Sequence, residues 1–94
     1  MAVFNIGETI ICSVDVKDDA GAYKDPATSM KIVVARTKPN YIVVVASTDM
    51  TKDSVGKYHY DFQTSTAIAG SYEATYTATD GTRITIEKDT FEVE

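Results

Sequence analysis

The sequence predicts one all-β domain, residues 1–94, built as a two-layer sandwich of seven antiparallel strands. The β-branched and aromatic residues Thr, Val, Ile, Tyr and Phe supply 40 of the 94 residues, whereas leucine and tryptophan are absent. Apolar and polar residues alternate with a period of two along most of the chain, and turn-forming residues separate the alternating segments. A small closed barrel is the alternative all-β architecture.

Four strands are expected in the first half of the chain. In the second of them alternation predicts one buried and one solvated face, because Ile10, Cys12, Val14 and Val16 are apolar whereas Ser13, Asp15 and Lys17 are polar. Turns are expected at residues 18–21 and at Lys38–Asn40, and the polar segment 48–55 is predicted to be a loop. The four predicted strands cover residues 3–6, 8–17, 29–36 and 41–47.

Three strands are expected in the second half, over residues 56–63, 70–79 and 82–93. Asp80–Gly81 predicts a tight hairpin between the last two, closed by a type I′ turn. In the final strand the apolar residues move from even positions, Ile84 and Ile86, to odd positions, Phe91 and Val93. That change of parity predicts a β-bulge or a short break across residues 87–90.

The predicted core gathers the apolar faces of these strands. Its members are Ile10, Cys12, Val14, Met30, Ile32, Val34, Tyr58, Tyr60, Phe62, Tyr72, Ala74, Tyr76, Ile84 and Ile86.

The net charge and the first residues of the chain limit the partners and the locations that we expect. The net charge of −5 argues against a partner that is a nucleic acid or an anionic membrane. The longest apolar stretch, residues 41–46, is far shorter than a bilayer-spanning helix, and the first residues do not resemble a signal peptide. We therefore expect a cytoplasmic location, or an extracellular one if the chain is an excised domain.

The sequence contains no recognisable arrangement of catalytic residues, so we do not expect an enzyme. Cys12 belongs to an apolar strand face and His59 to a polar one, so we do not expect them to form a nucleophile–base pair. The acidic residues fall in turns or at outward strand positions.

Calcium is the one cofactor that the acidic residues suggest, and otherwise none is expected. Asp18, Asp19 and Asp25 cluster around one turn, with Asp15 shortly before it. Carboxylates and loop carbonyls are the ligands that calcium prefers, although the spacing is not that of an EF-hand loop. The alternative is that these aspartates bond to backbone within the turn.

A row of threonines offers a second binding hypothesis. Thr75, Thr77, Thr79 and Thr85 would form a flat polar face that could bind a carbohydrate, or that simply faces solvent.

Two apolar runs that do not alternate predict an interface. If Met30, Ile32 and Val34 face the core, then Val33 and Ala35 face outward. In the neighbouring strand one of two alternating sets must also be exposed, either Ile42, Val44 and Ala46 or Tyr41, Val43 and Val45. Large exposed apolar patches are typical of interfaces, so we expect a homo-oligomer or a larger protein assembly; coverage by the chain itself is the alternative.

Several short motifs resemble those of immunoglobulin-like sandwiches. The likeness is to bacterial Ig-like and macroglobulin-like modules of prokaryotic surface proteins and of virion proteins of tailed phages. The matching segments are Gly7–Ile10, Asp25–Pro26, Gly56–Tyr60, Ala69–Ala74 and Ala78–Gly81.

The resemblance implies roles for single residues and for the whole chain. Tyr72, following Gly70, would be a tyrosine corner whose hydroxyl bonds to upstream backbone, and Gly81 would form the last turn. The core cysteine pair of antibody domains would map to Cys12 and Ala74, so no such disulfide can form. A structural role in a virion, as a capsid decoration or tail protein, is implied; the alternative is an adhesion module that binds a glycan or calcium.

Overall fold

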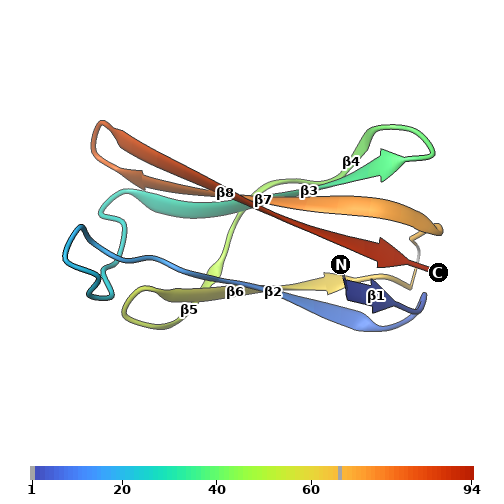
Figure 1. Ribbon diagram of the computed structural model, residues 1–94, viewed down its shortest axis with the longest axis horizontal. Helices are drawn as coiled ribbons and strands as arrows, with labels where there is room; N and C mark the ends of the chain where they lie inside the picture. Colours follow the sequence, from blue (N-terminus) through green and yellow to red (C-terminus); the bar gives the residue numbers. More distant parts are fainter. Residues whose placement is uncertain (1, 66) are drawn as a thin grey trace.

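Eight strands in two facing sheets form the fold, and the computed structural model describes residues 2–65 and 67–94 (Figure 1). The all-β, two-layer prediction is confirmed, whereas the predicted number of seven strands is wrong. The strands are β1 Ala2–Phe4, β2 Thr9–Asp15, β3 Ser29–Lys38, β4 Ile42–Asp49, β5 Thr51–Ser54, β6 Lys57–Gln63, β7 Gly70–Asp80 and β8 Arg83–Val93.

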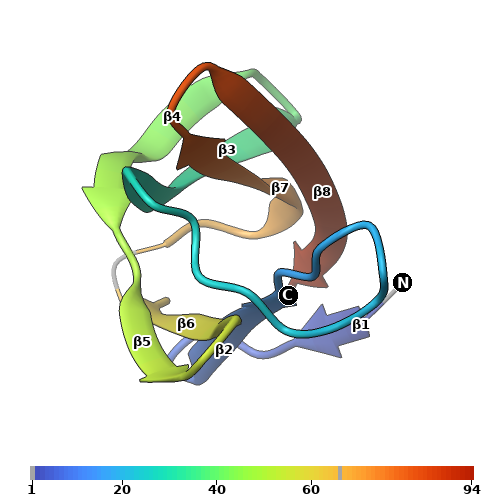
Figure 2. The ribbon, with the colours of Figure 1, turned by 90° about the vertical axis from the view of Figure 1, so that its left-hand side faces the viewer.

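The larger sheet has the strand order β1-β8-β7-β3-β4 and the smaller one the order β2-β6-β5 (Figure 2). All neighbours are antiparallel except β1 and β8, which run parallel with Ala2 opposite Phe91 and Phe4 opposite Val93. The prediction of purely antiparallel sheets is therefore wrong at β1. This strand joins the larger sheet before the chain crosses to β2 in the smaller one.

The prediction of a loop at residues 48–55 is also wrong. β4 continues to Asp49, and the chain then crosses between the sheets to form β5, which pairs with β6. Met50 lies at the crossing, where its side chain is buried and its N–H donates to the carbonyl of Met30 at 3.0 Å. A buried methionine in a mostly polar segment thus marks the passage through the core.

The β7–β8 hairpin forms as predicted, but with a different turn. Asp80 pairs with Arg83, so the turn residues are Gly81 and Thr82, and only Gly81 has a positive φ, at +63°. That pattern fits a type II′ turn and not type I′, which would force the β-branched Thr82 into a left-handed conformation.

β8 contains no bulge. Its register with β7 is continuous from the Asp80–Arg83 pair to the Gly70–Val93 pair. Because Phe91 and Val93 point into the core, the even-numbered Ile84 and Ile86 must point outward, and they are 63% and 58% exposed. Their assignment to the core is wrong.

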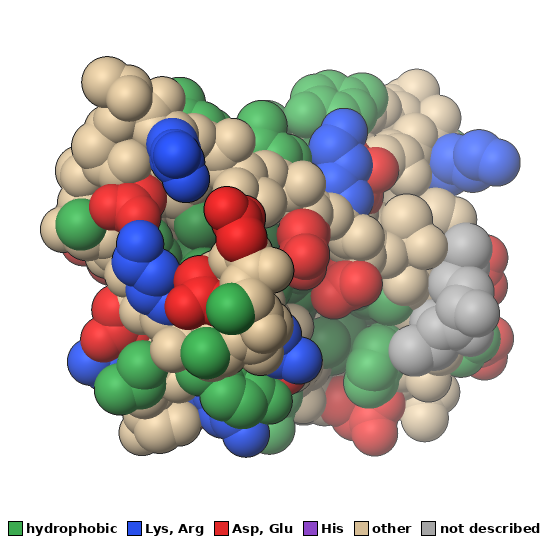
Figure 3. Space-filling model, turned by 60° about the vertical axis from the view of Figure 1, so that its left-hand side comes forward, with side chains coloured by type: hydrophobic (Ala, Val, Ile, Leu, Met, Phe, Trp, Pro, Cys, Tyr) green, Lys and Arg blue, Asp and Glu red, His purple; other side chains and the backbone are tan. Residues whose placement is uncertain are grey.

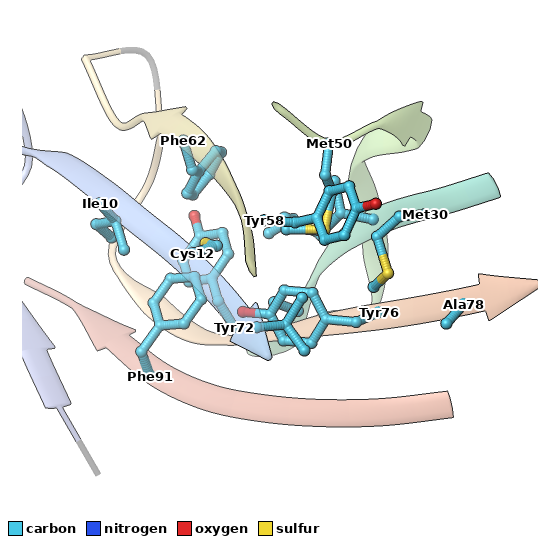
Figure 4. Packing of buried hydrophobic residues seen from close by; sticks show 14 of the residues in the cluster. Ile10, Cys12, Met30, Met50, Tyr58, Phe62, Tyr72, Tyr76, Ala78 and Phe91 are labelled. Atoms are coloured by element: carbon cyan, nitrogen blue, oxygen red, sulfur yellow. The ribbon is translucent and has the colours of Figure 1, made fainter. Parts of the chain in front are cut away.

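The rest of the predicted core is buried between the sheets (Figure 4), except Tyr60, which is half-buried. Tyr72 and Phe91 stack at 5.7 Å between ring centroids, and Phe62 lies 5.9 Å and 6.2 Å from them. Phe4 of β1 meets Phe91 edge-on at 6.0 Å. This aromatic cluster joins β1, β6, β7 and β8.

Tyr72 also makes a short local hydrogen bond. Its ring is 1% exposed, and its hydroxyl donates to the carbonyl of Ile68 at 2.5 Å. We expect Tyr72→Phe to lower the free energy of unfolding by about 1 kcal/mol, because this part-buried hydrogen bond is lost while the ring packing is kept. Urea unfolding measures this. Tyr23→Phe, at an exposed tyrosine, is the control, and an equal loss there would contradict the prediction.

Candidate protein-binding surface

A groove of about 450 Å³ opens between the edge of β4 and β6, and we name it the β4 groove. Among the described residues, β5 pairs only with Lys57, Tyr58 and His59 of β6, so the remainder of β6 has no described strand beside it on that side. The edge of the larger sheet, β4, lies across this opening. Its lining residues are Ile42, Val43, Val44, Val45, Tyr60, Phe62, Gln63 and Ala67.

β4 is exposed on both faces, which an alternating strand within a sandwich would not be. Its register with β3 shifts twice, so that Val43 lies opposite Ala35 and Val45 opposite Val34, and Val44 has no direct partner. Val44 is 40% exposed, whereas Val45 packs against the core. Members of both alternating sets of β4 are therefore exposed, although the sequence pattern required this of only one set.

The residues expected at the interface do not all lie together. Ile42, Val44 and Ala46 are exposed on β4, and Val33 is half-buried on the outer face of β3, opposite Thr75. The expectation for Ala35 is wrong, because this residue is only 4% exposed. Its methyl group lies on a central strand between two longer side chains.

The sequence reasoning missed the floor of the groove, formed by Tyr60, Phe62 and Ala67. The alternation in β6 indicated that Tyr60 and Phe62 face inward. It could not indicate that β5 would end before covering them.

The four aspartates proposed for calcium do not converge. Asp18 Oδ1 accepts hydrogen bonds from the N–H groups of Ala20 and Ala22, at 2.9 and 3.0 Å, and Asp15 and Asp19 are exposed. Within residues 2–65 and 67–94 no group of three or more His, Cys, Asp or Glu side chains could hold a metal ion. Asp18 thus bonds to backbone within its turn, which was the alternative to calcium binding.

Asp25 instead links the loop of residues 16–28 to the β5–β6 hairpin through hydrogen bonds. Its carboxylate accepts hydrogen bonds from Lys52 Nζ at 2.5 Å, Gly56 N at 2.8 Å and the Tyr58 hydroxyl at 3.1 Å. The Lys52 hydrogen bond, followed by that of Gly56, holds the pKa of Asp25 below its ordinary value. This end of the molecule mixes acidic, basic and apolar side chains (Figure 3).

The lowered pKa gives Asp25 a definite pH dependence. Its stabilising effect is complete above the ordinary carboxyl pKa near 4 and is lost as pH falls through the lowered value. Asp25→Asn should therefore unfold at lower urea concentration than the wild type at pH 7, and the difference should shrink below pH 4. Asp19→Asn, at an exposed turn residue, is the control. A difference that grows on acidification would contradict this assignment.

Cys12 and His59 lie on opposite faces of the smaller sheet. Cys12 is buried opposite Tyr60, and burial raises the pKa of its thiol to about 11. His59 Nδ1 lies 2.7 Å from Asp53 Oδ1. The two side chains thus do not meet as nucleophile and base.

The four threonines do not form one face. Thr75, Thr77 and Thr79 line the outer face of β7, but Thr85 lies opposite Ala78 and points to the other side. Ile86 lies beside Thr77, so the outer face is apolar as well as polar.

Comparison with known proteins gives no family for this chain. No protein-family model, no curated protein and no solved structure matches it.

The described residues form no helix that could span a bilayer.

Proposed function

We propose that this chain is a non-enzymatic immunoglobulin-like module that attaches to a larger protein assembly through the β4 groove. The assembly is a virion, in which the module is a capsid decoration or tail protein. The virion setting follows from the resemblance of the sequence motifs, whereas the attachment surface follows from the groove.

The strand order supports the immunoglobulin-like assignment. Immunoglobulin sandwiches oppose a sheet containing strands C, F and G to one containing B, E and D. Matching β2 to B and the later strands in turn places β4, β3, β7 and β8 in the order C′-C-F-G, facing β2, β6 and β5 in the order B-E-D. The bond from Tyr72, near the start of β7, to the Ile68 carbonyl fits a tyrosine corner.

One observation carries the attachment surface. The exposed side chains of Tyr41, Ile42, Val43 and Val44 adjoin an open groove whose floor is aromatic and aliphatic. An exposed, uncharged strand edge of this kind associates readily with an extended segment of another protein, which adds hydrogen bonds along β4 and covers the groove. The occupant we propose is an apolar β-strand segment of the shell or tail protein.

Val44→Lys tests this function. Virions are purified from the organism that carries this sequence, and binding of the chain is measured by cosedimentation. A charge at the rim of the groove should lower the affinity at least about tenfold, since an ammonium group resists burial in an apolar interface. The variant should fold normally, because exposed positions tolerate substitution to within about 0.5 kcal/mol. Val55→Lys, at an exposed valine outside the groove, is the matched control. Absence of the wild-type chain from purified virions, or unchanged cosedimentation of Val44→Lys, would contradict the proposal.

A further inference from the structure

We propose that two copies of this chain pair edge to edge along β8, forming an antiparallel dimer about a twofold axis. The inference goes beyond the proposed function and uses the opposite edge of the larger sheet, away from the β4 groove.

The outer edge of β8 is open over most of its length. Among the described residues its only neighbour on that side is β1, which pairs with Phe91, Glu92 and Val93 (Figures 1 and 2). Every residue from Gly81 to Thr90 is exposed. An open strand edge carrying two exposed isoleucines is a template for pairing with another strand.

The backbone of this edge has a defined polarity. A two-residue hairpin is closed by a hydrogen-bonded pair, here Asp80 and Arg83, so odd-numbered residues of β8 bond to β7. Even-numbered residues must then direct their N–H and C=O groups away from β7. Glu94 agrees with this parity, because its N–H donates to the Phe4 carbonyl at 2.8 Å and its carbonyl accepts from Ile6 N at 2.9 Å.

The sequence of β8 is complementary to itself in one antiparallel register. When Thr85 lies opposite Thr85 of a second copy, Ile84 lies opposite Ile86 and Arg83 opposite Glu87. The twofold axis repeats each pair, so two isoleucine pairs lie on the outer face and two ion pairs on the inner face. The isoleucines are also the residues whose backbone groups point outward, so the same pairs exchange hydrogen bonds.

Other registers that keep this backbone parity are less complementary. A slip of two residues in one direction pairs Ile86 with its copy and Arg83 with Asp89, but it sets Ile84 opposite Lys88 of the second copy, so two isoleucines lose an apolar partner. A slip in the other direction sets Ile86 opposite Thr82 and separates Arg83 from Glu87. The register centred on Thr85 is the one that satisfies both the apolar pairs and the charges.

Charge reversal tests this register. Arg83→Glu alone places two carboxylates opposite each other at both ends, and Glu87→Arg does the same with two guanidinium groups. We expect each variant to raise the dimer dissociation constant about tenfold, measured by sedimentation equilibrium from micromolar to millimolar protein. An equimolar mixture of the two variants should dimerise like the wild type, since both ion pairs then become complementary. The double variant Arg83→Glu/Glu87→Arg should also recover.

A crosslink tests the position of the axis. Thr85 and its copy would form a non-hydrogen-bonded pair with Cα atoms about 4.5 Å apart, which is within disulfide range. Mild oxidation should convert Thr85→Cys to a covalent dimer. Thr90→Cys, exposed on the same strand but distant from its own copy in this register, should not crosslink.

The results separate this proposal from the proposed function. A wild-type chain that stays monomeric at millimolar concentration overturns the β8 dimer and leaves the β4 groove untouched. A dimer that ignores charge reversal but dissociates on Val44→Lys also overturns it, because the contact would then lie at β4. A dimer that Val44→Lys leaves intact, and that the mixed charge variants restore, supports it.

Discussion

Phe91→Ala should lower the free energy of unfolding by about 3–5 kcal/mol, as expected when a buried phenylalanine is truncated. Phe91 is 4% exposed and contacts the rings of Phe4, Phe62 and Tyr72, which come from three different strands. Its removal leaves a cavity at the point where β1, β6 and β7 meet β8. A domain of this size has a total stability of roughly 5–15 kcal/mol, so much of it would be lost.

Thermal and urea unfolding measure this loss, and the melting temperature should fall by more than about 15 °C. The neighbouring Thr90 is exposed, so Thr90→Ala should change stability by no more than about 0.5 kcal/mol. If the two substitutions had similar effects, the aromatic cluster would not be the centre of the core.

Gly70→Ala should cost about 3 kcal/mol, at the upper end of the range for an overpacked site. A Cβ atom at Gly70 would lie 2.1 Å from the carbonyl oxygen of Lys38 and 3.3 Å from Arg36 Cδ. The two strands cannot simply separate, because Lys38 pairs with Ser71 and Arg36 with Tyr72. Any shift of β7 would therefore move the ring of Tyr72 within the core.

Gly81→Ala is the matched comparison, because a Cβ atom there meets open space and only the positive φ is unfavourable. That substitution should cost about 1 kcal/mol. Both glycines have a positive φ, +159° at Gly70 and +63° at Gly81, so the additional loss at Gly70 in urea unfolding measures the steric crowding. An equal loss at the two glycines would show that the close approach at Gly70 is relieved without cost.

Alternation predicted which residues share a face, but not always which face is buried. In β2, β6 and β7 one of the two alternating sets of residues is clearly more apolar, and the sequence therefore predicts which residues of these strands face the core. In β8 both parities carry apolar residues, and the decision depends on β7, whose Tyr72 and Gly70 set Phe91 and Val93 inward. That information is non-local, so the sequence pattern favoured Ile84 and Ile86 wrongly.

The β4 groove depends on features of still longer range. The run from Tyr41 to Ala46 indicated an exposed apolar surface. The two register shifts of β4 against β3 and the short length of β5 depend on how the two sheets meet, and the short β5 leaves Tyr60 only half-buried. Met50 shows the same limit, since one buried methionine in a polar segment resembles an ordinary loop residue.

The parallel pairing of β1 with the end of β8 has a mechanical consequence. Tension applied to Ala2 and Glu94 would slide the two strands lengthwise past each other, because they run in the same direction. Their hydrogen bonds, including those of Glu94 with Phe4 and Ile6, would then be strained together and not opened one after another. A domain pulled in this way resists force far better than one whose terminal strands peel apart.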